Sequence, residues 1–312
     1  MTTAGSLPGT PDEPVLIYDR IGKNKRQTWL MMAVFVVLVG ALVTALSYLL
    51  GGSWPVLPFV YAGLLAWVLF SYYMSSSIAL GVSGARQVTR EDEPELCRIV
   101  ENLSIGSGLP MPKVYVIEDS APNAFATGRD PKHASVAATR GLLDKLDKAE
   151  LEGVMAHEMS HVGNYDIRVM TITVVLVGII ALLADFAMRW AWFGAGSRGS
   201  NKNKGGAAAI IVIVAIVLAI LAPIAAQLIH LAISRQREYL ADASGALLCR
   251  NPDALARALE KISADREPLE VANKATAHLY IENPLKEHTS FLNNMFSTHP
   301  PVQERIRLLR AM

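Results

Sequence analysis

Four long apolar runs limit what this chain can fold into more than any other feature of its sequence. They cover about residues 29–50, 56–75, 169–188 and 207–233. A helix of about 20 apolar residues is long enough to cross the ~30 Å hydrocarbon core of a bilayer. The whole chain is 52% hydrophobic with a mean hydropathy of +0.30, which is high for a soluble globular protein. The sequence therefore predicts an integral membrane protein with four spanning helices, arranged as two hairpins.

Basic residues beside the first run set the expected orientation. The cluster Arg20–Arg26 is expected in the cytoplasm by the positive-inside rule, and each hairpin then returns the chain to the cytoplasmic face. The loop at 189–206 would lie outside although it carries four basic residues and no acids. This conflict keeps open the alternative that residues 169–233 lie in the membrane interface and do not span.

The apolar runs divide the chain into five segments. Residues 1–27 form an N-terminal cytoplasmic segment, and residues 28–80 and 169–233 form the two membrane hairpins. Two polar parts, 81–168 and 234–312, lie after the first and second hairpin. Because both are expected on the same side of the membrane, we expect them to build one soluble domain.

Local patterns predict that the soluble parts are mostly helical with a small β-sheet. Apolar spacing predicts a helix over 92–106 with Pro94 in its first turn, where no backbone N–H is needed. Alternating apolar residues and turn signals predict three strands, at 113–117, 123–127 and 134–139. Further helices are expected from residue 142 onward, over 252–262, and from Pro301, also with its proline in the first turn. The expected fold class is α+β, with four membrane-spanning helices and a mostly helical domain that carries the sheet.

An H-E-x-x-H motif, His157-Glu158-Met159-Ser160-His161, ends the first soluble part. On a helix, positions i and i+4 share a face, so His157 and His161 would project side by side. Two imidazoles placed in this way can supply two protein ligands of a catalytic zinc, and Glu158 can act as the general base on the activated water. The alternative is a helix whose histidines are ordinary polar surface residues.

A catalytic zinc site needs a third protein ligand and an open position. Glu238, after the fourth apolar run, is the candidate, and Asp242 follows one helical turn later on the same face. Asp242 can accept a hydrogen bond from the far nitrogen of a ligating histidine, while Arg237 is a candidate to orient Glu238. The alternative is an exposed, solvated helix on which these charges do nothing further. The cysteines Cys97 and Cys249 are expected to be free thiols and are not assigned to the metal.

These motifs together resemble the HtpX family of membrane zinc metalloproteases, which is related to the prenyl-protein (CAAX) proteases. The resemblance covers about residues 16–310 and includes the segments 157–161, 238–242, 122–128 and 297–301. It implies a gluzincin-type site in which His157, His161 and Glu238 bind one zinc ion and Glu158 is the base. The two soluble parts are then two parts of one protease domain.

The resemblance also implies a place for the substrate. Asn123, Ala124, Phe125, Ala126 and Thr127 would form a strand edge along which an extended substrate adds as a further strand. The alternative is a plain internal strand. A donor is also needed for the oxyanion, and the candidates are His299 and, as its helper, Asn123. The alternative for His299 is a turn that leads into the last helix.

The sequence thus predicts a zinc endopeptidase in the inner or plasma membrane, multi-pass, with its active site facing the cytoplasm. Resemblance to the family implies quality control of misfolded or damaged membrane proteins. A processing protease with one membrane or prenylated substrate, and a membrane scaffold that keeps zinc only for folding, remain as alternatives. The expected partners are unfolded or membrane proteins and the lipid bilayer. The near balance of 29 basic and 28 acidic residues gives no indication of nucleic-acid binding, and a homo-oligomer stays open.

Overall fold

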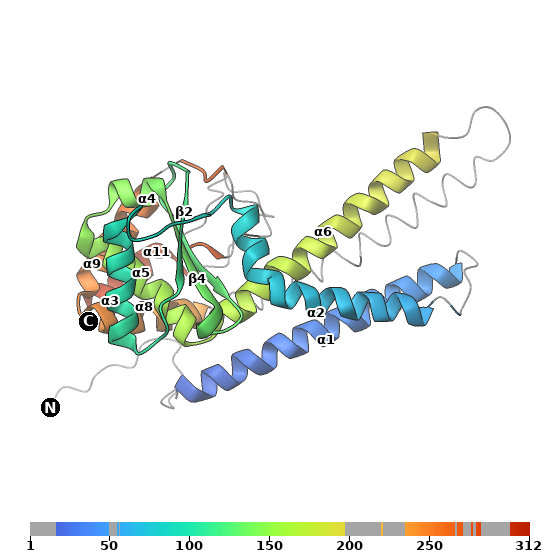
Figure 1. Ribbon diagram of the computed structural model, residues 1–312, viewed down its shortest axis with the longest axis horizontal. Coiled ribbons are helices and arrows are strands. Elements are labelled where there is room, and N and C mark those ends of the chain that lie inside the picture. Colours follow the sequence, from blue (N-terminus) through green and yellow to red (C-terminus); the bar gives the residue numbers. More distant parts are fainter. Residues whose placement is uncertain are drawn as a thin grey trace.

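The computed structural model describes residues 17–49, 55, 57–196, 220, 235–265, 267–270, 276, 279–281 and 300–312. Three long helices project from one side of a globular part (Figure 1). They are α1 (Ile17–Leu49), α2 (Leu57–Val82) and α6 (Asp166–Gly196). Helix α1 begins well before the first apolar run, so the basic cluster expected in a separate N-terminal segment is itself helical.

The projecting helices pack on one another through a narrow apolar seam and leave large apolar side chains exposed. The seam includes Phe35 of α1, Val68 of α2 and Leu176 of α6. Outside it, Val37 is 66% exposed and Phe59 is 79% exposed. Large apolar side chains exposed along neighbouring helices are typical of contact with a membrane or another protein.

Among the helices in the described ranges, α2 alone is by itself long and apolar enough to cross a bilayer. Helix α6 meets the same criterion only together with α5 (Lys148–Gly163), and the two are bent by 83° at their junction. Apart from residue 220, the fourth apolar run lies outside the described residues. The structure therefore supplies one clear membrane helix out of the four spans predicted from the sequence.

A small mixed sheet stands in the globular part, with strand order β1-β2-β4-β3. Strand β2 (Lys113–Ile117) pairs parallel with β4 (Ala134–Thr139), which pairs antiparallel with β3 (Ala124–Gly128). These strands confirm the prediction, with β3 shifted by one residue. The short strand β1 (Arg86–Gln87) was missed because two residues cannot show an alternating pattern.

The remaining helices form most of the globular part. They are α3 (Pro94–Ser107), α4 (Arg140–Lys145), α5, α8 (Arg235–Cys249), α9 (Pro252–Ala264) and α11 (Val302–Arg310). Helix α5 lies against strands β3 and β4, and α3, α8 and α9 pack on α5. Helix α5 begins with a capping box, in which Asp147 and Glu150 each accept a backbone N–H of the other. Pro94 lies in the first turn of α3 as predicted, but Pro301 is the N-cap of α11 and not part of its first turn.

Helix α5 crosses the core and is buried along most of its length. Helix α8 packs directly against it at Gly245, where a Cβ atom would lie 2.9 Å from the backbone nitrogen of His157. Only glycine permits this approach, so α8 packs closely on α5 at the first of the two histidines. The globular part is therefore mostly helical with a small mixed sheet, as the sequence predicts.

Candidate metal centre

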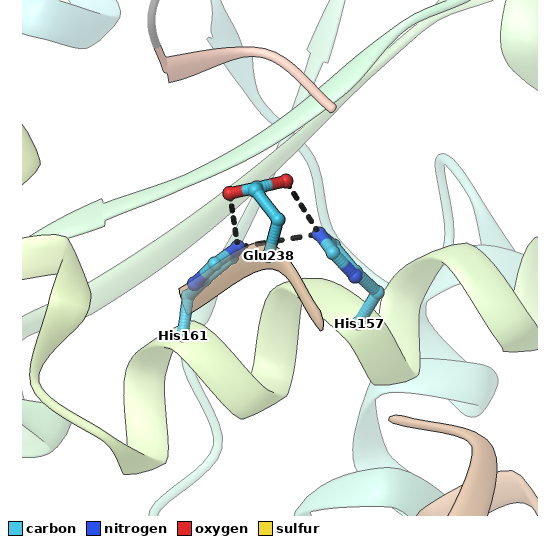
Figure 2. A group of neighbouring side chains, drawn as sticks. All are labelled: His157, His161 and Glu238. Carbon is cyan, nitrogen blue, oxygen red and sulfur yellow. Dashed lines mark hydrogen bonds and ion pairs between the residues drawn. The ribbon is translucent and has the colours of Figure 1, made fainter. Parts of the chain in front are cut away.

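Three buried side chains from α5 and α8 converge in the globular part (Figure 2). His157 and His161 lie one turn apart on α5, and their Nε2 atoms are 3.2 Å from each other. Glu238 faces both from α8, with one carboxylate oxygen 3.8 Å from Nε2 of His157 and the other 3.6 Å from Nε2 of His161. Donors bound at ~2.0–2.1 Å around a tetrahedral metal are themselves about 3.3 Å apart, so this spacing fits one metal ion.

The far nitrogen of each imidazole faces a carboxylate. Nδ1 of His157 lies 2.9 Å from Asp242, and Nδ1 of His161 lies 3.1 Å from Asp166. These carboxylates favour a proton on Nδ1 and therefore leave both Nε2 atoms available to a cation, as is usual for metal-binding histidines. The predicted role of Asp242 agrees with this position, whereas Asp166 was not singled out from the sequence.

The charges around the two imidazoles favour a cation between them. Four carboxylates, Glu158, Asp166, Glu238 and Asp242, and two guanidinium groups, Arg237 and Arg305, are buried in this region. With neutral histidines, these groups leave a net charge of −2, which a divalent ion would neutralise. Burial lowers the pKa of His161, but the Asp166 hydrogen bond and the nearby carboxylates outweigh burial and raise this pKa to about 9.

Asp242, the partner of His157, is itself bound by a residue of the C-terminal helix. Arg305 of α11 is fully buried and donates two hydrogen bonds to Asp242, at 2.8 and 2.7 Å. The same guanidinium lies 3.6 Å from Glu238 and donates to the carbonyl oxygen of Ile281 at 3.0 Å. Burial alone would raise the pKa of Asp242, but the charge and hydrogen bonds of Arg305 hold it below its usual value.

Asp166, the partner of His161, is itself bound by a residue of the first projecting helix. Asn24 of α1 donates from Nδ2 to Asp166 and to the carbonyl oxygen of Asn164, both at 2.8 Å. Arg237 lies 3.4 Å from Asp166 and donates to Gln27 of α1 at 2.7 Å. Because Arg237 is buried between Asp166 and α1, the alternative of an exposed, solvated helix is wrong for this residue.

Glu158 is buried next to the histidines, on the side of strand β3. Burial raises the pKa of Glu158, while the two neighbouring histidines act in the opposite direction. The backbone N–H of Ala126 in β3 favours the charged form of this carboxyl group and so acts to lower its pKa. A carboxylate with a raised pKa is a better proton acceptor, as a general base requires.

Strand β3 lies at the edge of the sheet, but its outer side already has partners within the chain. Ile281 donates its N–H to the carbonyl oxygen of Ala124 at 3.0 Å, and Gly128 donates to Thr171 of α6 at 3.1 Å. The rings of Phe125 and Tyr280 make an edge contact, with their centroids 5.1 Å apart. An extended substrate on this edge would have to displace at least the Ile281 contact.

Of the two residues expected to act on the oxyanion, the structure describes Asn123 but not His299. Asn123 is buried at the start of β3, where its backbone N–H donates to Thr139 at 2.8 Å and its Oδ1 accepts from the N–H of Ala124 at 3.1 Å. His299 lies outside the described residues.

Known proteins align with this sequence over nearly its full length. Residues 90–312 match the model of peptidase family M48. A protease HtpX homolog of Tropheryma whipplei (strain TW08/27) is 49% identical, over 95% of this chain and 99% of the relative. A protease HtpX homolog of Dictyoglomus thermophilum is 46% identical, over 96% of each chain. The crystal structure of S. mikatae Ste24p is similar at 18% identity with a TM-score of 0.48, covering 95% of this chain and 66% of that one.

The family match includes every residue of the metal centre found on α5 and α8, together with Arg305. The alignments with the HtpX homologs cover 95–96% of this chain and therefore extend beyond the family match toward the N-terminus. The chain therefore belongs to peptidase family M48 and, within it, to the HtpX metalloproteases.

Proposed function

We propose that this protein is a zinc-dependent endopeptidase whose metal is held by His157, His161 and Glu238. The observation that carries the proposal is the convergence of three buried donor atoms, all within 4.8 Å of one another, in surroundings that favour a positive charge. Two imidazoles and a carboxylate with an open position suit zinc better than magnesium or calcium, which prefer oxygen donors. Neither Cys97 nor Cys249 lies in this cluster.

Glu158 acts as the general base and acid of the reaction. When bound, zinc would polarise the scissile carbonyl and lower the pKa of a water molecule. Glu158 takes the proton of the attacking water and passes it to the leaving amine, so that no covalent intermediate is required. Asn123 and His299 remain the proposed donors to the oxyanion. The buried position of Glu158 beside the donors also argues against a scaffold, because a structural zinc site has no need of a base.

Peptide substrates would add to the edge of β3, through residues 123–127. Strand addition recognises the backbone of any extended sequence, which suits a protease that acts on many unfolded chains. The present contact between Ile281 and Ala124 occupies part of this edge, so binding includes its displacement. This mode supports quality control of misfolded or damaged membrane proteins more than the processing of a single partner.

The exposed apolar surface of α1, α2 and α6 supports a position in the membrane. We extend this to a multi-pass topology with four spans in the inner or plasma membrane, the metal centre facing the cytoplasm. The basic residues at the start of α1 support this orientation. The network from Asn24 to His161 agrees with it, because it places the metal centre at the end of α1 that carries those residues.

The comparison of wild type with Glu158→Gln tests this function. Both proteins are purified in detergent and assayed for bound zinc and for cleavage of casein and of an unfolded membrane protein. We expect one zinc per chain in both, with cleavage reduced by at least ~100-fold in the variant, the lower range for loss of a general base. Equal cleavage by the two proteins would contradict the mechanism. Cleavage at a single site in one partner, and of nothing else, would favour the processing alternative.

A further inference from the structure

A concave site lies beside the junction of the globular part and the projecting helices. It is a pocket of about 390 Å³ lined by Lys25, Pro110, Asp130, Pro131, Lys132, Tyr165 and Arg168. These residues come from α1, from the segment after α3, from the short 3-10 helix at Pro131–His133 and its cap, and from the α5–α6 junction. The pocket contains none of the residues assigned to the metal or to catalysis.

The lining of this pocket has an excess of positive charge. Among the described residues, no carboxylate forms an ion pair with Lys25, Lys132 or Arg168. The one acid of the lining, Asp130, is already engaged, because it accepts hydrogen bonds from His133 and lies 3.7 Å from Arg129. Three cations without acidic partners around one cavity indicate an anionic ligand.

Arg168 gives the strongest indication of such a ligand. Its guanidinium is half-buried, lies 5.8 Å from the Trp29 ring and 5.3 Å from the Tyr72 ring, and donates a hydrogen bond to the Tyr72 hydroxyl. Its Nε atom is buried and has no hydrogen-bond partner in the described part of the chain. A partly buried cation without an anion is unfavourable, and a guanidinium is well suited to bind a phosphate through two hydrogen bonds.

A second cation is held at the rim by an aromatic ring. Nζ of Lys25 lies 4.3 Å from the centre of the Tyr165 ring. Tyr165 has a φ of 60°, a left-handed conformation that is uncommon for a residue other than glycine. The constrained backbone at the α5–α6 junction thus presents the ring to Lys25 and keeps the cation at the pocket.

The position of the pocket identifies the source of the phosphate. Trp29, Tyr72 and Tyr73 form a cluster of aromatic rings beside Arg168, and such belts lie at the headgroup level of a bilayer. We propose that this pocket binds the phosphodiester headgroup of an anionic phospholipid, which contacts Lys25, Lys132 and Arg168. This inference is independent of the proposed reaction.

The test compares lipid binding by full-length wild type with that of Lys25→Gln/Lys132→Gln. Native mass spectrometry measures retention of phosphatidylglycerol and of phosphatidylcholine after exchange into mixed micelles. We expect wild type to prefer phosphatidylglycerol, and the double variant to reduce that preference by about fivefold for each lost charge. The matched control is Lys23→Gln/Arg26→Gln, which removes two exposed cations of α1 that do not line the pocket, and it should keep the preference.

Three results would overturn the proposal. Equal preference in wild type and Lys25→Gln/Lys132→Gln would show that the pocket does not bind the headgroup. An equal loss in the control would assign the effect to general surface charge. If inorganic phosphate at low millimolar concentration displaces phosphatidylglycerol from wild type, the pocket binds free phosphate and the lipid assignment fails. Arg168→Gln provides a second variant, with circular dichroism to verify its fold, and should lose the preference as well.

Discussion

The two histidines of the metal centre are supported by different parts of the molecule. His157 faces Asp242, which Arg305 holds with two hydrogen bonds, and this chain of contacts stays within helices α5, α8 and α11 of the globular part. His161 faces Asp166, at the start of α6, and Asp166 in turn accepts from Asn24 of α1. One half of the site is therefore complete within the globular part, whereas the other half depends on a helix that enters the projecting bundle.

Asp166 and Asn24 connect the metal centre to the projecting helices. The 83° bend between α5 and α6 separates His161 from Asp166 by one sharp turn of the chain. A shift of α1 would move Asn24 and therefore Asp166, but it would leave the Asp242–Arg305 pair in place. We expect the His157 side to contribute mainly to folding stability. We expect the His161 side to contribute mainly to metal affinity, which would change when α1 moves.

The largest effect is expected for Arg305→Met. This change leaves Asp242 and Glu238 buried without their cation, and breaking a buried ion pair in this way costs about 3–5 kcal/mol. The free energy of unfolding, measured by urea titration of the metal-free protein in detergent, should fall by this amount.

The matched control for this change is Arg307→Met on the same helix. Arg307 pairs with Glu304 at the surface, and its side chain is 59% exposed. An exposed pair contributes about 0–1 kcal/mol, so this control should be nearly as stable as wild type. Equal loss in the two variants would mean that the pairing of Arg305 with Asp242 does not stabilise the domain.

The smaller effect is expected for Asn24→Ala. Loss of the hydrogen bond to Asp166 removes about 1 kcal/mol, so zinc affinity in a chelator competition should fall about fivefold, with little change in the urea midpoint. Lys23→Ala, one position earlier and exposed, is the control and should bind zinc as wild type does. Unchanged zinc affinity in Asn24→Ala would show that α1 does not support the metal centre. Absence of zinc from wild type would instead contradict the metal assignment itself.

Local patterns in the sequence were sufficient for the predicted helices and strands and for placing His157 and His161 on one helix face. Glu238 was chosen from its position after the fourth apolar run, and its convergence with the two histidines is a result of the tertiary structure. The i, i+4 spacing places the two histidines on one face whatever surrounds the helix. The outer contacts were not accessible in this way, because Arg305 lies 63 positions from Asp242 and Asn24 lies 142 positions from Asp166. Local periodicity does not predict contacts between residues so far apart in the chain. In the sequence, Asn24 is recognisable only as part of a basic cluster.

The edge of β3 shows the same limit. The sequence predicts a strand there, and the resemblance implies a free edge for substrate. Ile281 and Thr171 contact that edge from distant parts of the chain, and neither contact has a signal in the pattern of β3 itself. The strand itself was predictable from its alternating residues. Which residues contact its outer edge depends on tertiary packing.

X-ray absorption spectroscopy at the zinc edge tests the central assignment most directly. For the purified full-length protein, we expect two imidazole nitrogens and oxygen donors at ~2.0–2.2 Å, with no sulfur at ~2.3 Å. Glu238→Ala should lose zinc or change the oxygen donors. A sulfur donor in wild type, or the same spectrum and zinc content in wild type and Glu238→Ala, would contradict a metal held by His157, His161 and Glu238.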